Sequence, residues 1–161
     1  MSKILIAFDP STKSTGYAVF KDQELIKYGA FEENSKEVLE RINNLSNKTE
    51  ELINKYQPND MAIENVQITM SAPTAKALLG LQLLLELKAY NRNIPYSLIR
   101  PTHWRKVLGL SNSSKLKRAQ KKKEAIQYVV NKYNVPEDSA DDICDAICIG
   151  ECYLKENNNE G

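Results

Sequence analysis

The stretch KILIAFDPSTKSTGYAV, residues 3–19, constrains the fold of this chain more than any other part of the sequence. An apolar run, Ile4 to Phe8, ends at Asp9 and is followed by a turn of small hydroxyl residues, by Gly16 and by a second apolar run. This pattern predicts a strand that ends at Asp9 and a tight hairpin beside it. Asp9 would then hold a carboxylate at the open edge of a sheet.

The rest of the chain predicts strands and helices in the order of a mixed αβ domain. The predicted strands are Ile4 to Phe8, Thr15 to Phe20, Glu24 to Phe31, Met61 to Val66 and Pro95 to Ile99. The predicted helices are Ser35 to Tyr56, Ser71 to Arg92, Thr102 to Leu108, Lys115 to Tyr133, and a last helix that Ser139 caps and that ends near Lys155. Short turns join the first three strands, so these should form an antiparallel meander.

The length of 161 residues fits one domain that buries roughly two-thirds of its unfolded surface. We expect this domain to span residues 1–156 and the tail 157–161, NNNEG, to be disordered. No apolar run approaches the ~20 residues that a membrane span needs, and Met1-Ser-Lys leads into a strand rather than a signal peptide. These features favour a cytoplasmic protein.

Three cysteines, Cys144, Cys148 and Cys152, lie four residues apart on one side of the last predicted helix. This odd count favours reduced, half-buried side chains over disulfides. The spacing is only a weak indication of a metal cluster.

The distribution of charge is more informative than the formal net charge of +1. Residues 100–134 carry 10 Lys and Arg against one acid, whereas residues 135–161 carry one Lys against eight acids. A dense basic block that faces an acidic block indicates a polyanionic partner held beside a cation-binding group of carboxylates.

Candidate carboxylates occur at the ends of two strands, Asp9 and Glu64, and at the start of the last helix, Asp141, Asp142 and Asp145. They would meet if the two strands are neighbours and the helix crosses their ends. Carboxylate oxygens are ligands of Mg²⁺ or Mn²⁺ rather than of zinc. Asp145 lies three residues from Asp142 and four from Asp141, so it shares a helix face with either, and the choice between them stays open.

Each of these acids also has a simpler explanation. Acids at a helix N-terminus interact favourably with the helix dipole, and the strand-end acids could be capped or paired separately. However, Asp9 is flanked by Phe8 and Pro10, where an unpaired buried charge costs on the order of several kcal/mol unless a cation offsets it. Burial therefore favours a shared cation site.

Three segments resemble the motifs of one family. DPSTKSTGYAV, from Asp9, resembles the first motif of the RuvC branch of the retroviral-integrase and RNase H superfamily. IENV, from Ile63, resembles its second acidic motif, and ADDICDAICIG, from Ala140, resembles its closing D-x-x-D-A helix. The order and spacing agree over about residues 3–153. The resemblance implies an RNase H-like fold: a five-stranded mixed sheet, three antiparallel strands and then two parallel ones, flanked by helices.

The resemblance also implies an activity. Members are Holliday junction resolvases, homodimers that nick four-way DNA by metal-dependent hydrolysis and leave 5′ phosphates. Carried over by position, Asp9, Glu64, Asp142 and Asp145 would be the catalytic acids and would hold two Mg²⁺ or Mn²⁺ ions ~4 Å apart. Asp142 is preferred because it keeps the D-x-x-D spacing, and Asp141 is its substitute.

Lys123 matches best the DNA-contacting lysine of the family, although Lys121 or Lys122 would fit with a small register shift. The basic block suits contacts to phosphates better than a base code. The other expected DNA contacts are Lys115, Lys117, Arg118, Arg105 and Gln67. Cellular members usually carry an aromatic residue where this chain has Gln67, so we expect tolerance for other branched DNA.

The segment RPTHWRK, residues 100–106, resembles phage-encoded members. Within it we expect His103 to be hydrogen-bonded or to face DNA rather than to bind a metal, and Trp104 to anchor its helix on the core. The helix 71–92 is apolar over more than one face, which favours homodimerisation through it. The alternatives are a YqgF-like nuclease acting on structured RNA, a non-catalytic junction-binding module, and an ATPase of the sugar-kinase fold, for which the chain is short.

Overall fold

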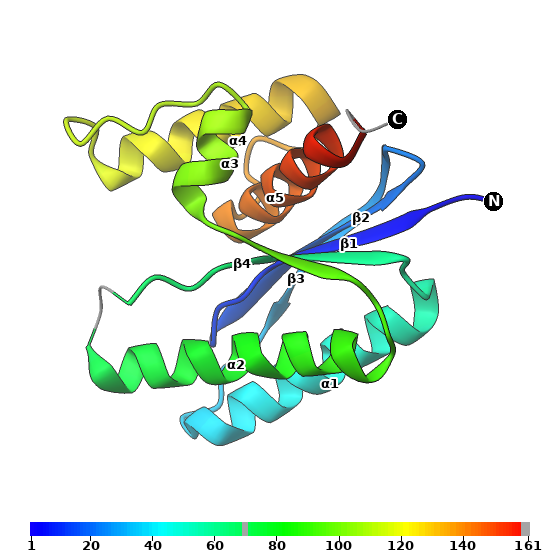
Figure 1. The fold of residues 1–161 in the computed structure, drawn as a ribbon. Helices are drawn as coiled ribbons and strands as arrows, with labels where there is room; N and C mark the ends of the chain where they lie inside the picture. The colour runs from blue at the N-terminus through cyan, green and yellow to red at the C-terminus, as the bar shows by residue number, and fades with distance from the viewer. Residues whose placement is uncertain (69–70, 159–161) are drawn as a thin grey trace.

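The computed structural model describes residues 1–68 and 71–158 and has three layers (Figure 1). A five-stranded sheet lies in the middle, with α1 and α2 on one face and α3, α4 and α5 on the other. The strands are β1 (Ile4–Asp9), β2 (Ser14–Lys21), β3 (Glu24–Glu32), β4 (Asp60–Glu64) and β5 (Tyr96–Ile99). The helices are α1 (Val38–Tyr56), α2 (Ala72–Asn91), α3 (Pro101–Val107), α4 (Arg118–Tyr133) and α5 (Asp141–Asn158).

The strand order is β3-β2-β1-β4-β5. β1, β2 and β3 are antiparallel, whereas β4 pairs parallel with both β1 and β5. The predicted sheet, with three antiparallel and two parallel strands, is therefore confirmed. Phe8 pairs with Ile63, so Asp9 and Glu64, one residue further along, end neighbouring strands at the same edge.

β1 is buried on both faces, which explains its unbroken run of apolar residues. Leu5 and Ala7 point toward α5 and pack in one core cluster. Ile6 and Phe8 point the other way and pack in a second cluster with residues of α1 and α2. The strand that carries Asp9 is thus held from both sides, and its last residue has little freedom to move.

Gly16 brings the first turn of α5 directly onto the sheet. A Cβ atom at this position would lie 2.0 Å from the carbonyl oxygen of Asp142, so no larger residue fits without moving the helix. Gly16 also pairs with Asp9 across the β1–β2 hairpin. The backbone contact therefore fixes the start of α5 beside the end of β1.

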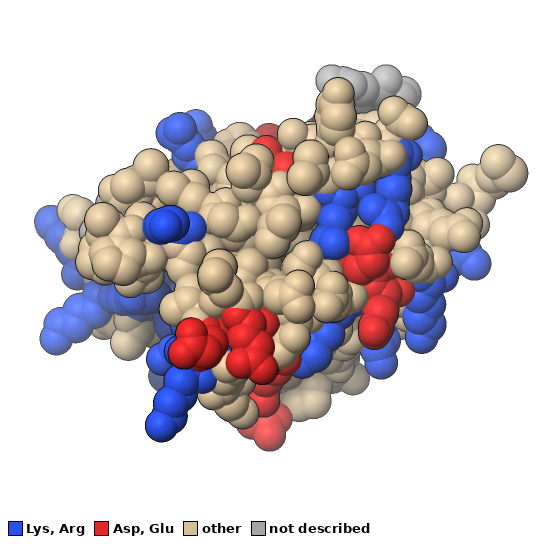
Figure 2. Space-filling view, turned by 90° about the horizontal axis from the view of Figure 1, so that it is seen from below, with Lys and Arg blue, Asp and Glu red and all other residues tan. Residues whose placement is uncertain are grey.

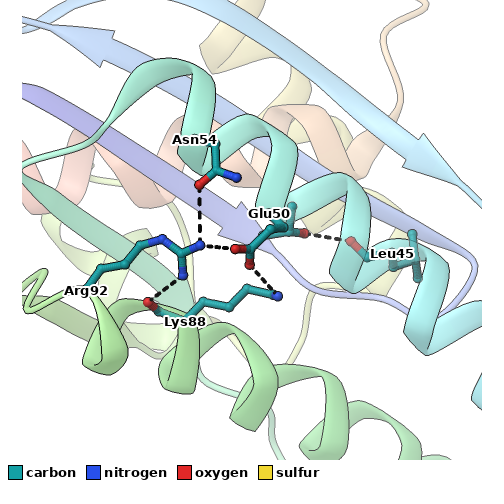
Figure 3. Close-up of polar contacts among 6 residues, drawn as sticks. Leu45, Glu50, Asn54, Lys88 and Arg92 are labelled. Carbon is teal, nitrogen blue, oxygen red and sulfur yellow. Dashed lines mark hydrogen bonds and ion pairs between the residues drawn. The ribbon is translucent and has the colours of Figure 1, made fainter.

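On the opposite face, Glu50 of α1 joins the two outer helices (Figure 3). It accepts from Lys88 Nζ at 2.6 Å and from Arg92 of the α2 C-cap, and Arg92 also donates to Asn54 at 3.3 Å. All three ion-pair partners are partly buried, so this network is less exposed to screening than a surface pair.

Two helices begin later than predicted. α4 starts at Arg118 rather than at Lys115, because Ser113 Oγ accepts from the Lys115 amide at 3.2 Å and holds a local turn before the helix. α1 starts at Val38 rather than at Ser35, whose hydroxyl bonds to Glu40 instead. Apart from α5, the other elements agree with the prediction to within two residues.

The predicted ends of α5 are wrong. The Ala140 carbonyl accepts the first helical hydrogen bonds, from Ile143 and Cys144, so Ser139 is not the cap. Ala140 itself is exposed. At the other end the helix continues to Asn158, and Asn157 Nδ2 donates to the Tyr153 carbonyl at 2.8 Å. The predicted tail 157–161 is thus ordered over its first two residues, and residues 159–161 lie outside the described chain.

The three cysteines of α5 are free thiols, as predicted, but they are fully buried rather than half-buried. They pack in the same core cluster as Ala146 and Ile147. Over residues 1–68 and 71–158, none of the helices is both long and apolar enough to cross a membrane.

Candidate active site

The structure brings together three of the predicted acids. Asp9 at the end of β1, Glu64 at the end of β4 and Asp145 on α5 each offer a carboxylate oxygen, and these atoms all lie within 4.8 Å of one another. Parallel strands place their carboxyl ends at one edge, and the Gly16 contact lays α5 across that edge. The convergence that the sequence predicted is therefore present.

Asp141 and Asp142, the first two residues of α5, have different surroundings. Burial raises the pKa of Asp142, while the neighbouring Ser14, Lys122 and Asp9 lower it, so Asp142 lies beside Asp9. Asp141 pairs with Lys122 at 2.5 Å and has 37% of its side chain exposed, although its charge also raises the pKa of Asp145. These surroundings favour Asp142 over Asp141 as the fourth acid of the candidate site.

Burial and mutual repulsion make this site hold protons tightly. Burial, and then the charges of Glu64 and Asp145, raise the pKa of Asp9 well above its usual value. Burial and Asp145 raise the pKa of Glu64 to about 8, and burial, Asp141 and Asp142 raise the pKa of Asp145 to about 7. The nearby positive side chains do not neutralise the negative charge of this cluster. Closely placed carboxylate oxygens are the ligands that divalent cations such as Mg²⁺ prefer.

These pKa shifts predict an unusual dependence of stability on pH. The folded chain binds protons more tightly than the unfolded chain, whose carboxyls titrate near pH 4. The stabilisation from Asp9, Glu64 and Asp145 is therefore complete at about pH 4 and is lost as pH rises through 7 to 8. We expect Tm in EDTA to fall by roughly 5 °C or more between pH 5 and 9. Added Mg²⁺ should raise Tm more at pH 9 than at pH 5.

Thermal unfolding in EDTA and in Mg²⁺ at pH 5, 7 and 9 checks this expectation. Glu33 and Glu151 have lowered pKa values, so they change the stability of the protein only at pH values below this range. Asp9→Asn is the control, because it removes one buried charge from the cluster and should flatten the profile. A Tm in EDTA that rises from pH 5 to 9 would contradict the assignment.

Trp104 of α3 approaches the cluster from the side. Its ring is 3% exposed and packs in the core, so the predicted anchoring role is confirmed. The indole Nε1 is buried and has no hydrogen-bond partner of normal geometry in the described chain. It lies near Glu64, where it lowers the carboxyl pKa but does not outweigh burial. The sequence did not predict this contact with the acids.

A groove beside the acids is lined by basic side chains. Its lining residues include Glu64, Asp145, Trp104, Arg105, Arg118, Lys121 and Lys122. A neighbouring hollow on α4 is lined by both Lys122 and Lys123, with Ile126 and Val130. Of the three lysines that the sequence left open, Lys121 and Lys122 thus lie in the groove that reaches the acids, and Lys123 lies outside it.

Arg105 is built into the protein and does not project toward solvent. It is 5% exposed, and its guanidinium donates to the carbonyls of Ser111 and Lys121 at 2.7 and 3.1 Å and to Glu124 at 3.0 Å. These bonds join α3, the segment after it and α4. Arg105 thus shapes the groove, while its donors are used within the protein.

Two exposed segments flank the acids on one side of the molecule (Figure 1). Residues 109–117, with the exposed Lys115 and Lys117, lie between α3 and α4. Residues 65–68, with the exposed Gln67, follow β4. Both segments lie at the end of the sheet where β1 and β4 finish (Figure 1).

A protein-family model described as "Crossover junction endodeoxyribonuclease RuvC" matches residues 5–153. The chain belongs to the RuvC family. Similar members include the RuvC of Dictyoglomus thermophilum, 27% identical over 95% of this chain and 98% of that protein. The RuvC of Ehrlichia canis is 29% identical over 96% of this chain and 98% of that protein. The resemblance inferred from the three motifs is thereby confirmed.

Solved structures confirm the RuvC-type fold. T. thermophilus RuvC in complex with a Holliday junction substrate superposes with a TM-score of 0.78 at 13% identity, over 97% of this chain and 96% of that chain. Fowlpox virus resolvase, solved with Holliday junction DNA, superposes with a TM-score of 0.62 at 16% identity, over 96% and 98% of the two chains.

Proposed function

We propose that this RuvC-family chain, acting as a single domain, is a metal-dependent endonuclease that resolves Holliday junctions and other branched DNA by paired nicking. The observation that carries the proposal is the meeting of Asp9, Glu64 and Asp145 within 4.8 Å beside a basic groove. Buried carboxylates that repel one another can bind metal ions, and the basic side chains beside them can bind phosphate. This combination is suited to hydrolysis of a phosphodiester.

Asp9, Glu64, Asp142 and Asp145 would hold two Mg²⁺ or Mn²⁺ ions. Such ions, when bound, activate the attacking water and stabilise the leaving 3′ oxygen, which leaves a 5′ phosphate. Asp9 is central, because its pKa responds to the charges of all the other acids. Trp104 is buried beside Glu64 on the α3 side of the site and lowers the pKa of its carboxyl, although burial raises that pKa more.

The groove would bind the DNA backbone. Lys121, Lys122 and Arg118 line it together with two of the acids, so they can hold the phosphate next to the cleaved bond. Lys122 also pairs with Asp141, and bound phosphate would compete for this lysine. We therefore favour Lys122 over Lys123 as the essential lysine. Lys115, Lys117 and Gln67 would contact the DNA farther from the acids.

The exposed face of α2 would form the homodimer. Leu79, Leu83, Leu87 and Tyr90 are 36, 63, 48 and 73% exposed. Their spacing of four, four and three residues places them in one stripe along the helix. A broad uncharged area crosses the face that α1 and α2 present (Figure 2). A partner chain that covered this stripe would place two acid clusters on one junction.

The test is to size the protein and then to assay a synthetic four-way junction, labelled on each strand in turn, with Mg²⁺ or Mn²⁺. We expect a dimer and symmetric paired nicks with 5′ phosphates. Cleavage of folded RNA in preference to the junction would favour the YqgF-like alternative. Junction binding without nicking at any metal concentration would favour the non-catalytic alternative.

Asp142→Asn and Asp141→Asn should separate the two neighbouring acids. Asp142 contacts Asp9, so its loss should lower the nicking rate at least about 100-fold. The charge of Asp141 is paired with Lys122, so its loss should change the rate less than about fivefold. Single-turnover rates at saturating enzyme measure both. The reverse order of effects would assign the ligand to Asp141.

A further inference from the structure

A second group of metal-ligand side chains lies away from the acids. His103 comes from α3, and Cys152 and Glu156 come from α5, one turn apart. His Nε2, the cysteine Sγ and a carboxylate oxygen all lie within 4.8 Å of one another. His103 Nε2 is hydrogen-bonded to Glu156 Oε1 at 2.6 Å, as predicted for this residue, and Cys152 Sγ is 4.0 Å from Glu156 Oε2. The group shares no residue with the cluster at Asp9.

We propose that His103, Cys152 and Glu156 bind one transition-metal ion of the Zn²⁺ class. Imidazole nitrogen, thiolate sulfur and carboxylate oxygen are the donors that zinc uses in proteins. Mg²⁺ and Ca²⁺ prefer oxygen ligands alone, so this mixed set selects against the ions of the candidate nuclease site. On binding, the Cys152 thiol would lose its proton to solvent and its sulfur would ligate the ion.

The placement of the three side chains suits such a site. Cys152 and Glu156, at positions i and i+4, share one face of α5, and the third ligand arrives from a different helix. Cys152 is buried, whereas the side chains of His103 and Glu156 are 49% and 44% exposed. The ion can therefore enter from solvent, and water can complete a tetrahedral set.

An ion at this position would fasten α3 to α5. α3 continues from His103 directly into Trp104 and Arg105, which line the groove. α5 carries Asp142 and Asp145 at its other end. The ion would thus stabilise the packing of the groove wall against the helix that bears two of the acids, without contacting DNA.

Co²⁺ is the probe, because a thiolate–Co²⁺ bond gives a near-ultraviolet charge-transfer band that carboxylate-bound Co²⁺ lacks. We expect the full chain to show this band with one equivalent of ion and Zn²⁺ to abolish it. Cys152→Ser should remove the band. His103→Gln and Glu156→Gln, at exposed side chains, should each weaken the affinity at least about tenfold. Cys148→Ala, one turn earlier on α5, is the matched control and should keep the band.

A second measurement tests whether the ion binds at His103, Cys152 and Glu156 and not at the candidate nuclease site. In an Asp9→Asn background, Zn²⁺ should raise Tm by several degrees, and His103→Gln should remove this increase. The absence of a thiolate band at millimolar Co²⁺ would overturn the proposal. A band of unchanged affinity in His103→Gln, or one lost in Cys148→Ala, would also overturn it. None of these readouts depends on nuclease activity.

Discussion

Asp9→Asn is expected to reduce the rate of junction nicking at least about 1,000-fold while junction affinity changes less than about threefold. The carboxylate of Asp9 ends the central strand and adjoins Glu64, Asp142 and Asp145. An amide in its place keeps the shape but loses the charge that would hold a cation, which forfeits on the order of 4 kcal/mol of transition-state stabilisation. Single-turnover cleavage and junction binding in Ca²⁺ measure the two quantities separately.

The same variant has a stability signature that distinguishes it from a misfolded protein. Asp9 is buried among like charges, so removing its charge should leave Tm in EDTA at neutral pH equal or higher. Asp138→Asn is the matched control, because it makes the same change at an exposed acid just before α5. Full nicking activity in Asp9→Asn would refute the proposed active site, and a lower Tm would refute the electrostatic account.

Leu83→Glu with Leu87→Glu is expected to convert the protein to a monomer and to reduce paired nicking to less than about one-tenth. The two leucines lie in the middle of the exposed stripe on α2. Burying four carboxylates in a two-fold interface should weaken the dimer at least about 100-fold. Sizing by light scattering gives the oligomeric state. A supercoiled plasmid with a cruciform reports paired nicks as linear product and single nicks as open circles.

Ile26→Glu is the matched control for the dimer. Ile26 is 44% exposed on β3, at the sheet edge farthest in strand order from β5, so its replacement should change neither size nor product pattern. A dimer that persists in the double variant would place the interface elsewhere. A wild-type protein that is monomeric at micromolar concentration and still yields linear product would contradict the requirement for a dimer.

The convergence of the acids was predictable because it depends on strand direction, which the sequence pattern shows. Parallel neighbours end at one edge, so Asp9 and Glu64 had to meet once β1 and β4 were adjacent. Helical spacing alone left the choice between Asp141 and Asp142 open, and only the D-x-x-D spacing of the family motif favoured Asp142. The rotation of α5 about its axis depends on the contact of its backbone with Gly16, a tertiary contact 126 residues away along the chain.

The roles of individual basic residues also could not be predicted from the sequence. Arg105 belongs to a charge run that predicted DNA contacts, yet it is buried against Glu124 and Ser111. Neighbours in such a run have the same local pattern, and only packing separates a groove residue such as Lys122 from Lys123 on the adjacent surface. The approach of Trp104 to Glu64 likewise needs the fold, because 40 residues separate them.

The docking of α5 on the sheet also has a consequence for synthesis on the ribosome. Asp9 and Glu64 emerge early, but Asp142 and Asp145 lie on the last helix that the described chain forms. Until α5 has emerged, the sheet face at Gly16 is uncovered and the cluster lacks two of its four acids. Domains form as units once enough chain is available. A nascent chain from which α5 has not yet emerged would therefore lack the complete proposed nuclease centre.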